Sequence, residues 1–121
     1  MAKSVMIVDD AAFMRMSIRN SLIKNGFEVI DEAEDGEVGI KKYMEHKPDL
    51  VTLDITMPKM DGLEALKAIL KHDPKAKVIM LSAMGQESKV REAITSGAKS
   101  FIVKPFKEDS LVSSIKKVLS M

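Results

Sequence analysis

Four short apolar runs, each followed by a charged or reactive side chain, constrain this chain more than any other feature. They cover residues 5–8, 50–53, 78–81 and 101–103. They are followed, in that order, by Asp9 with Asp10, by Asp54, by Ser82, and by Lys104 with Pro105. Because the carboxyl ends of parallel strands lie at one edge of a sheet, we expect three carboxylates, a hydroxyl and an ammonium group to converge there. Such a set suits a bound Mg²⁺ and a phosphoryl group.

Composition limits the alternatives. The 121 residues are typical of one domain, and a content of 45% hydrophobic residues is enough for a core. The sequence has no Cys, so disulfides are excluded. The balance of 19 Lys and Arg against 18 Asp and Glu, with only four Phe and one Tyr, predicts no nucleic-acid partner. No apolar run approaches the roughly 20 residues that span a bilayer, and the amino terminus lacks a signal-peptide pattern. We therefore expect a cytoplasmic protein that does not bind a membrane.

Apolar runs of strand length alternate with segments of helical period, which is typical of βα units. The predicted strands lie near residues 4–8, 27–31, 49–53, 77–82 and 99–103. The predicted helices lie near residues 12–25, 36–46, 62–72, 86–96 and 107–119. Five units are too few for a closed eight-stranded barrel, so the pattern predicts an open, doubly wound α/β sheet. The near-continuous apolar strands indicate burial on both faces, and we expect most of the ten Met residues to fill the core.

The acidic residues at the strand ends suggest a metal site. Asp9, Asp10 and Asp54 would repel one another without a counter-ion, and Mg²⁺ prefers such oxygen ligands. A backbone carbonyl just after Asp54, that of Thr56, would complete the ligand set. His46 and His72 lie on polar stretches late in predicted helices, so we interpret both as solvated surface residues and expect no zinc.

The same groups suit phosphoryl transfer. Carboxylates such as that of Asp54 are known nucleophiles toward phosphorus, while Lys104 offers a positive charge and Ser82 a hydroxyl donor. Any one of these residues alone is more often a solvated loop residue. Their occurrence after different strands of one small domain favours a shared site.

In combination, four segments resemble the receiver domain of two-component response regulators. They are Val8-Asp9-Asp10, residues 54–62 with the sequence DITMPKMDG, Ser82-Ala83, and Lys104-Pro105-Phe106. The resemblance covers essentially the whole chain. It implies a flavodoxin-like (βα)₅ fold with five parallel strands in the order 2-1-3-4-5.

The resemblance also implies roles for individual residues. Asp54 would be the phosphoacceptor, and Mg²⁺ would be held by Asp9, Asp10, Asp54 and the backbone carbonyl of Thr56. Ser82 would be the switch hydroxyl that moves toward the phosphoryl group, and Lys104 would pair with that group. A cis peptide bond is expected between Lys104 and Pro105.

Phe101 would be the switch aromatic, turning inward as the surface of the fourth helix, last strand and last helix changes shape. A plain core Phe is the alternative interpretation of this residue. The resemblance further implies a signalling protein and not an enzyme. Such a protein catalyses only its own phosphorylation and dephosphorylation.

The partners follow from the subfamily. We predict one receiver domain over residues 1–121 with no effector domain, so output would require docking. The segment from Val8 to Arg15 is similar to stand-alone, CheY-like chemotaxis regulators. That similarity implies a CheA-like sensor histidine kinase and a flagellar motor switch protein or adaptor as partners, leaves room for a dedicated phosphatase, and favours a monomer.

Three other functions share parts of this pattern. A single-domain relay regulator would use the same chemistry at Asp54 and pass its phosphoryl group to a histidine phosphotransferase. A haloacid-dehalogenase-type phosphatase would need a second acid two residues after its nucleophile, where this chain has Thr56. A nucleotide-binding domain would need a glycine-rich loop after the first strand, which is absent from the sequence.

Overall fold

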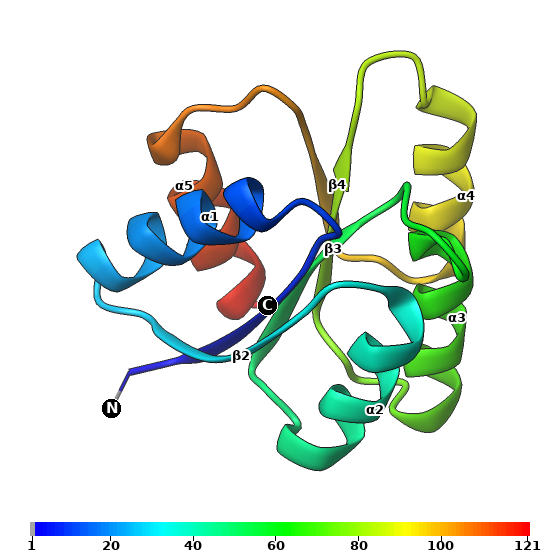
Figure 1. The fold of residues 1–121 in the computed structure, drawn as a ribbon, viewed down its shortest axis with the longest axis horizontal. Helices are drawn as coiled ribbons and strands as arrows, with labels where there is room; N and C mark the ends of the chain where they lie inside the picture. Colours follow the sequence, from blue (N-terminus) through cyan, green and yellow to red (C-terminus); the bar gives the residue numbers. More distant parts are fainter. Residues whose placement is uncertain (1) are drawn as a thin grey trace.

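The computed structural model describes residues 2–121, which alternate between strands and helices along the chain (Figure 1). The strands are β1 (Ser4–Val8), β2 (Glu28–Ala33), β3 (Leu50–Asp54), β4 (Val78–Ser82) and β5 (Ser100–Val103). The helices are α1 (Ala12–Lys24), α2 (Gly36–His46), α3 (Gly62–His72), α4 (Glu87–Ser96) and α5 (Glu108–Leu119).

The five strands form one parallel sheet in the order β2-β1-β3-β4-β5, which confirms the predicted fold. Each βα unit must cross over to start the next parallel strand, so helices cover the sheet on both sides. Figure 1 shows α1 and α5 on one face and α2, α3 and α4 on the other. Within residues 2–121 no helix combines the length and apolar character needed to cross a membrane.

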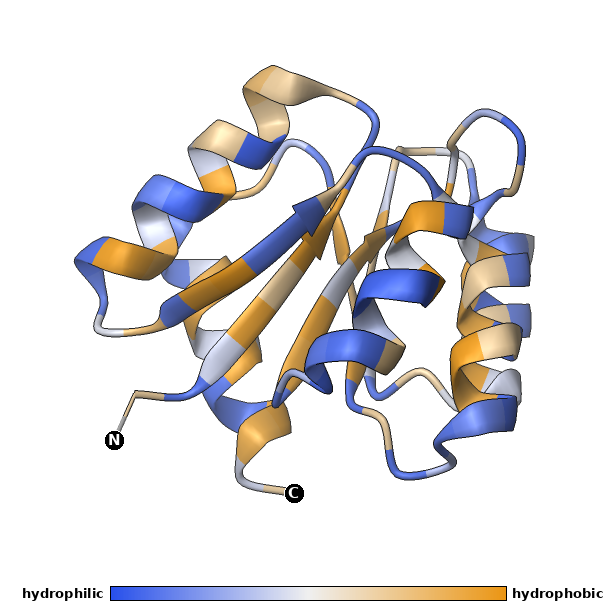
Figure 2. Cartoon of the chain, turned by 60° about the horizontal axis from the view of Figure 1, so that its bottom comes forward, coloured by the Kyte–Doolittle hydropathy of each residue, from blue (hydrophilic) through white to orange (hydrophobic). Residues whose placement is uncertain are grey.

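Successive residues of each central strand serve opposite faces of the sheet. In β1, Met6 and Val8 pack in the cluster beneath α2, α3 and α4, whereas Val5 and Ile7 pack in the cluster beneath α1 and α5. All four are fully buried, and each such side chain contributes about 1.5–3 kcal/mol by leaving water. The hydrophobic central strands in Figure 2 therefore hold both helical layers in place and fix the position of their carboxyl ends.

The edge strand β2 departs from the sequence prediction. It was expected near residues 27–31 but ends at Ala33, because Asp31, Glu32 and Ala33 continue the backbone pairing with β1 beyond an irregularity in register after Val5. Its side chains are mostly half-buried instead of continuously apolar and buried. Backbone hydrogen bonding therefore extends an edge strand through charged residues that an apolar pattern excludes.

One expectation about the surface was wrong. His46 is half-buried, and its Nε2 lies 2.9 Å from Asp31 Oδ2, whereas His72 is exposed as predicted. Among the nine described methionines, Met6, Met57 and Met80 are buried, and the half-buried Met14 and Met60 pack against the core. The other four, Met16, Met44, Met84 and Met121, are exposed.

Candidate functional site

The carboxyl edge of the sheet carries the residues singled out in the sequence. Asp54 and Ser82 end β3 and β4, while Asp9 and Lys104 directly follow β1 and β5. Backbone hydrogen bonds continue beyond the strands, from Asp9 N–H to the Ala33 carbonyl (3.0 Å) and from Lys104 N–H to the Ser82 carbonyl (2.7 Å). The functional side chains therefore start from backbone that neighbouring strands still hold, which limits the entropy cost of placing them.

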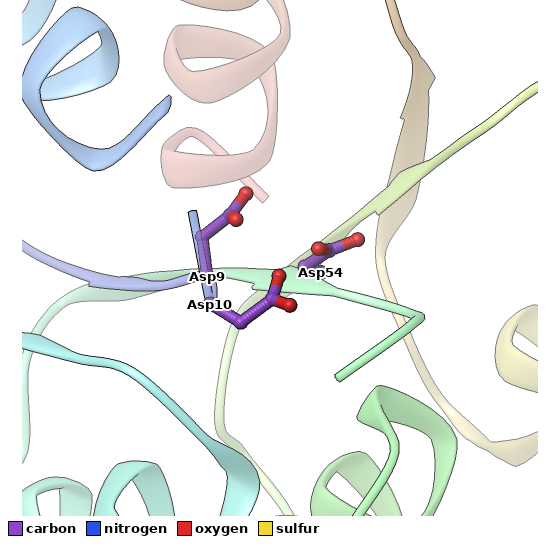
Figure 3. A group of neighbouring side chains, drawn as sticks. All are labelled: Asp9, Asp10 and Asp54. Atoms are coloured by element: carbon purple, nitrogen blue, oxygen red, sulfur yellow. The ribbon is translucent and has the colours of Figure 1, made fainter. Parts of the chain in front are cut away.

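Three carboxylates meet at this edge (Figure 3). Asp9, Asp10 and Asp54 each offer an oxygen, and these atoms all lie within 4.8 Å of one another. Asp9 and Asp54 are buried and Asp10 is exposed, so the cluster is open to solvent on one side. The predicted convergence of the carboxylates is present in the structure.

A glycine permits the loop after β3 to fold back onto the site. Gly62 N–H donates to the Ile55 carbonyl at 2.6 Å, and a Cβ at Gly62 would collide with the backbone carbonyl oxygen of Asp54. The close approach explains the need for glycine at the start of α3. It also makes the position of Asp54 depend on the loop that carries Thr56.

Lys104 joins two of the carboxylates. Its Nζ donates to Asp9 Oδ2 at 3.0 Å and lies 3.4 Å from Asp54 Oδ2. Burial alone would lower the pKa of Lys104, but the hydrogen bond to Asp9 and the charges of Asp54 and Asp9 outweigh it and raise the pKa. Lys104 is therefore a fixed positive charge in the site. The peptide bond between Lys104 and Pro105 is cis, the geometry that the resemblance implies.

Asp54 differs from an ordinary surface carboxylate. Burial and the nearby negative charge of Asp9 raise its pKa to about 6, although Lys104 and the Thr56 N–H oppose the shift. The site therefore carries more negative charge than its one lysine neutralises. An additional cation would relieve this repulsion.

Ser82 supplies a second unsatisfied group. Its side chain is 1% exposed, and its Oγ has no hydrogen-bond partner among the described residues 2–121. Leaving a buried hydroxyl unpaired costs about 1–3 kcal/mol, so such a group often marks the place of a ligand atom. An all-oxygen donor set with surplus negative charge fits a hard divalent cation such as Mg²⁺, and the Ser82 hydroxyl and Lys104 fit an oxyanion.

Comparison with known proteins identifies the family of this chain. The family model described as "Response regulator receiver domain" matches residues 5–116. The chain belongs to this family. The receiver domain is also 59% identical over 120 residues to "Chemotaxis protein CheY" of Bacillus subtilis (strain 168), covering 99% of this chain and all of the relative. It is 55% identical over 118 residues to the protein of the same name from Thermotoga maritima, covering 98% of both chains.

Solved structures agree. A CheX–CheY–BeF₃–Mg²⁺ complex from Borrelia burgdorferi contains a chain with a TM-score of 0.92 and 43% identity, covering 96% of this chain and 88% of that one. The response regulator domain of Thermotoga maritima CheB also gives a TM-score of 0.92, at 34% identity and with 100% and 98% coverage. This chain is thus a CheY-like response regulator receiver domain.

Beyond the acidic cluster, the receiver domain carries an apolar groove of about 560 Å³. Ser82, Ile94, Phe101 and Val103 are among the residues that line it. Phe101 is 45% exposed, so it is not a plain core residue. The groove is bounded by α4, β5 and the loop between β4 and α4. No α5 residue lines it, unlike the three-element surface that the resemblance implies.

Sequence reasoning missed one residue of this region, Gln86. Its Nε2 donates to Thr56 Oγ1 at 2.6 Å, and its Oε1 accepts from Ala83 N–H at 2.7 Å. Thr56 is exposed, and its hydroxyl is thus engaged while its backbone lies beside Asp54. A lone Gln at a predicted helix start carries no sequence signal for such a bridge.

Proposed function

We propose that this receiver domain accepts a phosphoryl group on Asp54 from a CheA-like sensor histidine kinase in a Mg²⁺-dependent reaction, and that phosphorylation controls docking to the flagellar motor. The observation that carries the proposal is the meeting of Asp54 with Asp9, Asp10 and Lys104 at one edge of the sheet. No single sequence motif creates this arrangement, because its members come from three different βα units.

The residues divide the chemistry among them. A carboxylate oxygen of Asp54 forms a bond to phosphorus while the phosphorus–nitrogen bond of a phosphohistidine breaks, and the released imidazole takes up a proton. Lys104 pairs with one phosphoryl oxygen, and the Ser82 hydroxyl donates to another. Asp9, Asp10, Asp54 and the Thr56 carbonyl would hold Mg²⁺, which when bound supplies positive charge against the phosphoryl oxygens.

The output surface is the groove between α4 and β5. Ser82 lines this groove, so its movement toward a phosphoryl group on Asp54 changes the groove directly. Phe101 then turns inward from its exposed position, and the altered surface binds a helix of a flagellar motor switch protein or adaptor. The relatives named CheY and the Borrelia CheX–CheY complex support chemotaxis as the setting, with CheX-type proteins as additional partners.

Treatment with acetyl phosphate and Mg²⁺, followed by intact mass and site mapping, tests the chemistry. We expect one phosphoryl group on Asp54, no incorporation when Mg²⁺ is chelated, and none in Asp54→Asn. Asp49→Asn, at the opposite edge of the sheet, is the matched control and should be phosphorylated normally. Labelling of Asp54→Asn at the wild-type level would disprove the assignment.

A second experiment separates motor control from relay. The phosphorylated protein is mixed in parallel with a motor switch component and with a histidine phosphotransferase. Binding to the motor component supports the proposal. Transfer of the phosphoryl group to the phosphotransferase without motor binding would favour the relay function.

A further inference from the structure

We propose that Gln86 is a positioning residue that holds the phosphoryl site in its resting arrangement by bridging the two loops beside it. The inference rests on the proposed function, because it assigns a regulatory contact to the same site. Gln86 immediately precedes α4 and lies 30 residues from Thr56 in the chain. Its side chain joins the loop after β3 to the loop after β4.

The two hydrogen bonds of the bridge fix the orientation of the side-chain amide. Ala83 N–H can only donate, so it requires the Oε1 atom of Gln86, at 2.7 Å. The Nε2 atom then faces Thr56 and donates to its Oγ1 at 2.6 Å. Both ends of the amide are therefore used, one on each loop.

The bridge is not a helix cap. The side chain of Gln86 makes no hydrogen bond to the first N–H groups of α4, which is the usual role of a polar residue at this position. Its hydrogen-bonding capacity is used between loops instead. A purely local role in starting α4 does not explain this choice of partners.

One end of the bridge leads to the phosphoacceptor. Thr56 lies two residues after Asp54, in the loop that directly follows β3. A displacement of Thr56 therefore moves backbone that is joined to Asp54 through a single residue, Ile55. Through Thr56, Gln86 contacts the backbone that supports the reacting carboxylate.

The other end leads to the switch hydroxyl. Ala83 directly follows Ser82, whose buried Oγ lacks a partner among the described residues. Movement of Ser82 toward a phosphoryl group shifts Ala83 as well, and the Gln86–Ala83 hydrogen bond opposes that shift. Gln86 also lines the groove that contains Phe101, so release of the bridge frees the groove's rim at the start of α4.

The bridge therefore stabilises the resting state relative to the phosphorylated one. Removal of such a hydrogen bond should favour the phosphorylated arrangement about three- to tenfold, which corresponds to about 0.7–1.4 kcal/mol. Four proteins test this: the wild type, Gln86→Ala, Thr56→Val, and the double variant. Thr56→Val removes the hydroxyl but keeps the backbone carbonyl and the β-branched shape.

Beryllofluoride with Mg²⁺ serves as the phosphoryl analogue, titrated while the amide signals of Ser82 and Ala83 are followed by NMR. We expect its dissociation constant to fall about three- to tenfold in each single variant, and no further in the double variant, because both substitutions break one bridge. Ser88→Ala, an exposed neighbour in the first turn of α4, is the matched control and should bind like the wild type.

A spectroscopic signature distinguishes a released bridge from a static one. The side-chain amide signals of Gln86 should shift in the wild type when beryllofluoride binds, whereas a purely structural bridge would keep its signals. Unchanged or weaker binding by Gln86→Ala, or additive effects in the double variant, would overturn the inference. Failure of the wild type itself to bind beryllofluoride with Mg²⁺ would instead overturn the proposed function, and with it the role of the bridge.

Discussion

The parallel strands begin at one edge of the sheet, the amino edge, and end at the carboxyl edge described above. Both edges carry similar kinds of polar side chain, but they differ in how completely these side chains are hydrogen-bonded. At the amino edge, Asp49 accepts hydrogen bonds from the Ser4 N–H (2.8 Å) and the Ser4 hydroxyl (3.1 Å). The hydroxyl of buried Tyr43 donates to Asp73 at 2.7 Å. The first pair links the start of β1 to the residue before β3, and the second links α2 to the residue after α3.

At the carboxyl edge the pairing is incomplete. Asp54 lies near two other carboxylates and shares Lys104 with Asp9, while Ser82 Oγ has no partner within residues 2–121. The pKa values show the same contrast, since that of Asp49 is lowered by its hydrogen bonds to Ser4 and that of Asp54 is raised by burial. Polar groups at the amino edge are paired with one another and stabilise the fold, whereas those at the carboxyl edge keep unpaired charge and hydrogen-bonding capacity that a ligand could use.

The largest expected effect comes from Lys104→Ala, which removes the only cationic side chain that pairs with the carboxylates of Asp9, Asp10 and Asp54 within residues 2–121. We expect phosphorylation by acetyl phosphate to persist, because Asp54 and the metal-binding carboxylates remain. Without the Lys104–phosphoryl contact, phosphorylation should no longer change affinity for the output partner. Binding of a motor component before and after phosphorylation measures this. A wild-type increase in affinity in the variant would contradict the role of Lys104.

A smaller effect concerns stability and pH at the carboxyl edge. The folded-state pKa of Asp54 is about 6, above the ordinary value near 3.8, so folding favours its protonated form. Its contribution is fully favourable below about pH 4 and is lost as the pH rises through 6. In EDTA at pH 8, Asp54→Asn should therefore be more stable than the wild type by about 1–3 kcal/mol. The difference should shrink toward pH 4.

Urea unfolding at pH 4, 6 and 8 measures this difference. Added Mg²⁺ should stabilise the wild type more than Asp54→Asn at pH 8, because the cation binds the native acidic cluster. If Asp54→Asn were no more stable than the wild type in EDTA at pH 8, repulsion among the carboxylates would not destabilise the native state. The carboxyl edge would then be as well satisfied as the amino edge.

The sequence predicted more of the residues at the candidate site than of the contacts that surround it. Asp54 and Ser82 end the buried strands β3 and β4, Lys104 follows the partly exposed edge strand β5, and the parallel pairing of these strands brings their ends together. An apolar run that forms a parallel strand therefore predicts that the residue after it lies at the carboxyl edge of the sheet. The strand order rested on the family resemblance, since periodicity alone indicates only an open parallel sheet.

Features that depend on side-chain pairing were not predictable in this way. His46 on α2 pairs with Asp31 on the edge strand β2, and Gln86 reaches Thr56 across two loops. Each pair joins polar residues of ordinary surface type. Burial drives a periodic signal in sequence, but a hydrogen bond between two polar side chains leaves none.

Tyr43→Phe tests the amino edge with an intermediate effect. Burial and the adjacent Asp73 raise the pKa of the Tyr43 hydroxyl, and this stability is present below about pH 10 and lost at higher pH. The variant should lose about 1 kcal/mol near neutral pH by urea unfolding. Its stability should also fall less steeply above pH 10, while phosphorylation of Asp54 stays unchanged. Impaired phosphorylation would show that the two edges are coupled.

Asp49→Asn should have the smallest effect and the opposite pH dependence to Asp54→Asn. The hydrogen bonds from Ser4 lower the pKa of Asp49 in the folded state, so its stabilising contribution is present above about pH 4 and lost as the pH falls further. Because the carboxylate is exposed and screened by solvent, the variant should lose only about 0.5 kcal/mol at pH 7. That loss should shrink as the pH falls below about 4. A gain in stability at pH 7, as expected for Asp54→Asn, would mean that carboxylates at both edges are strained and that incomplete pairing does not mark the functional edge.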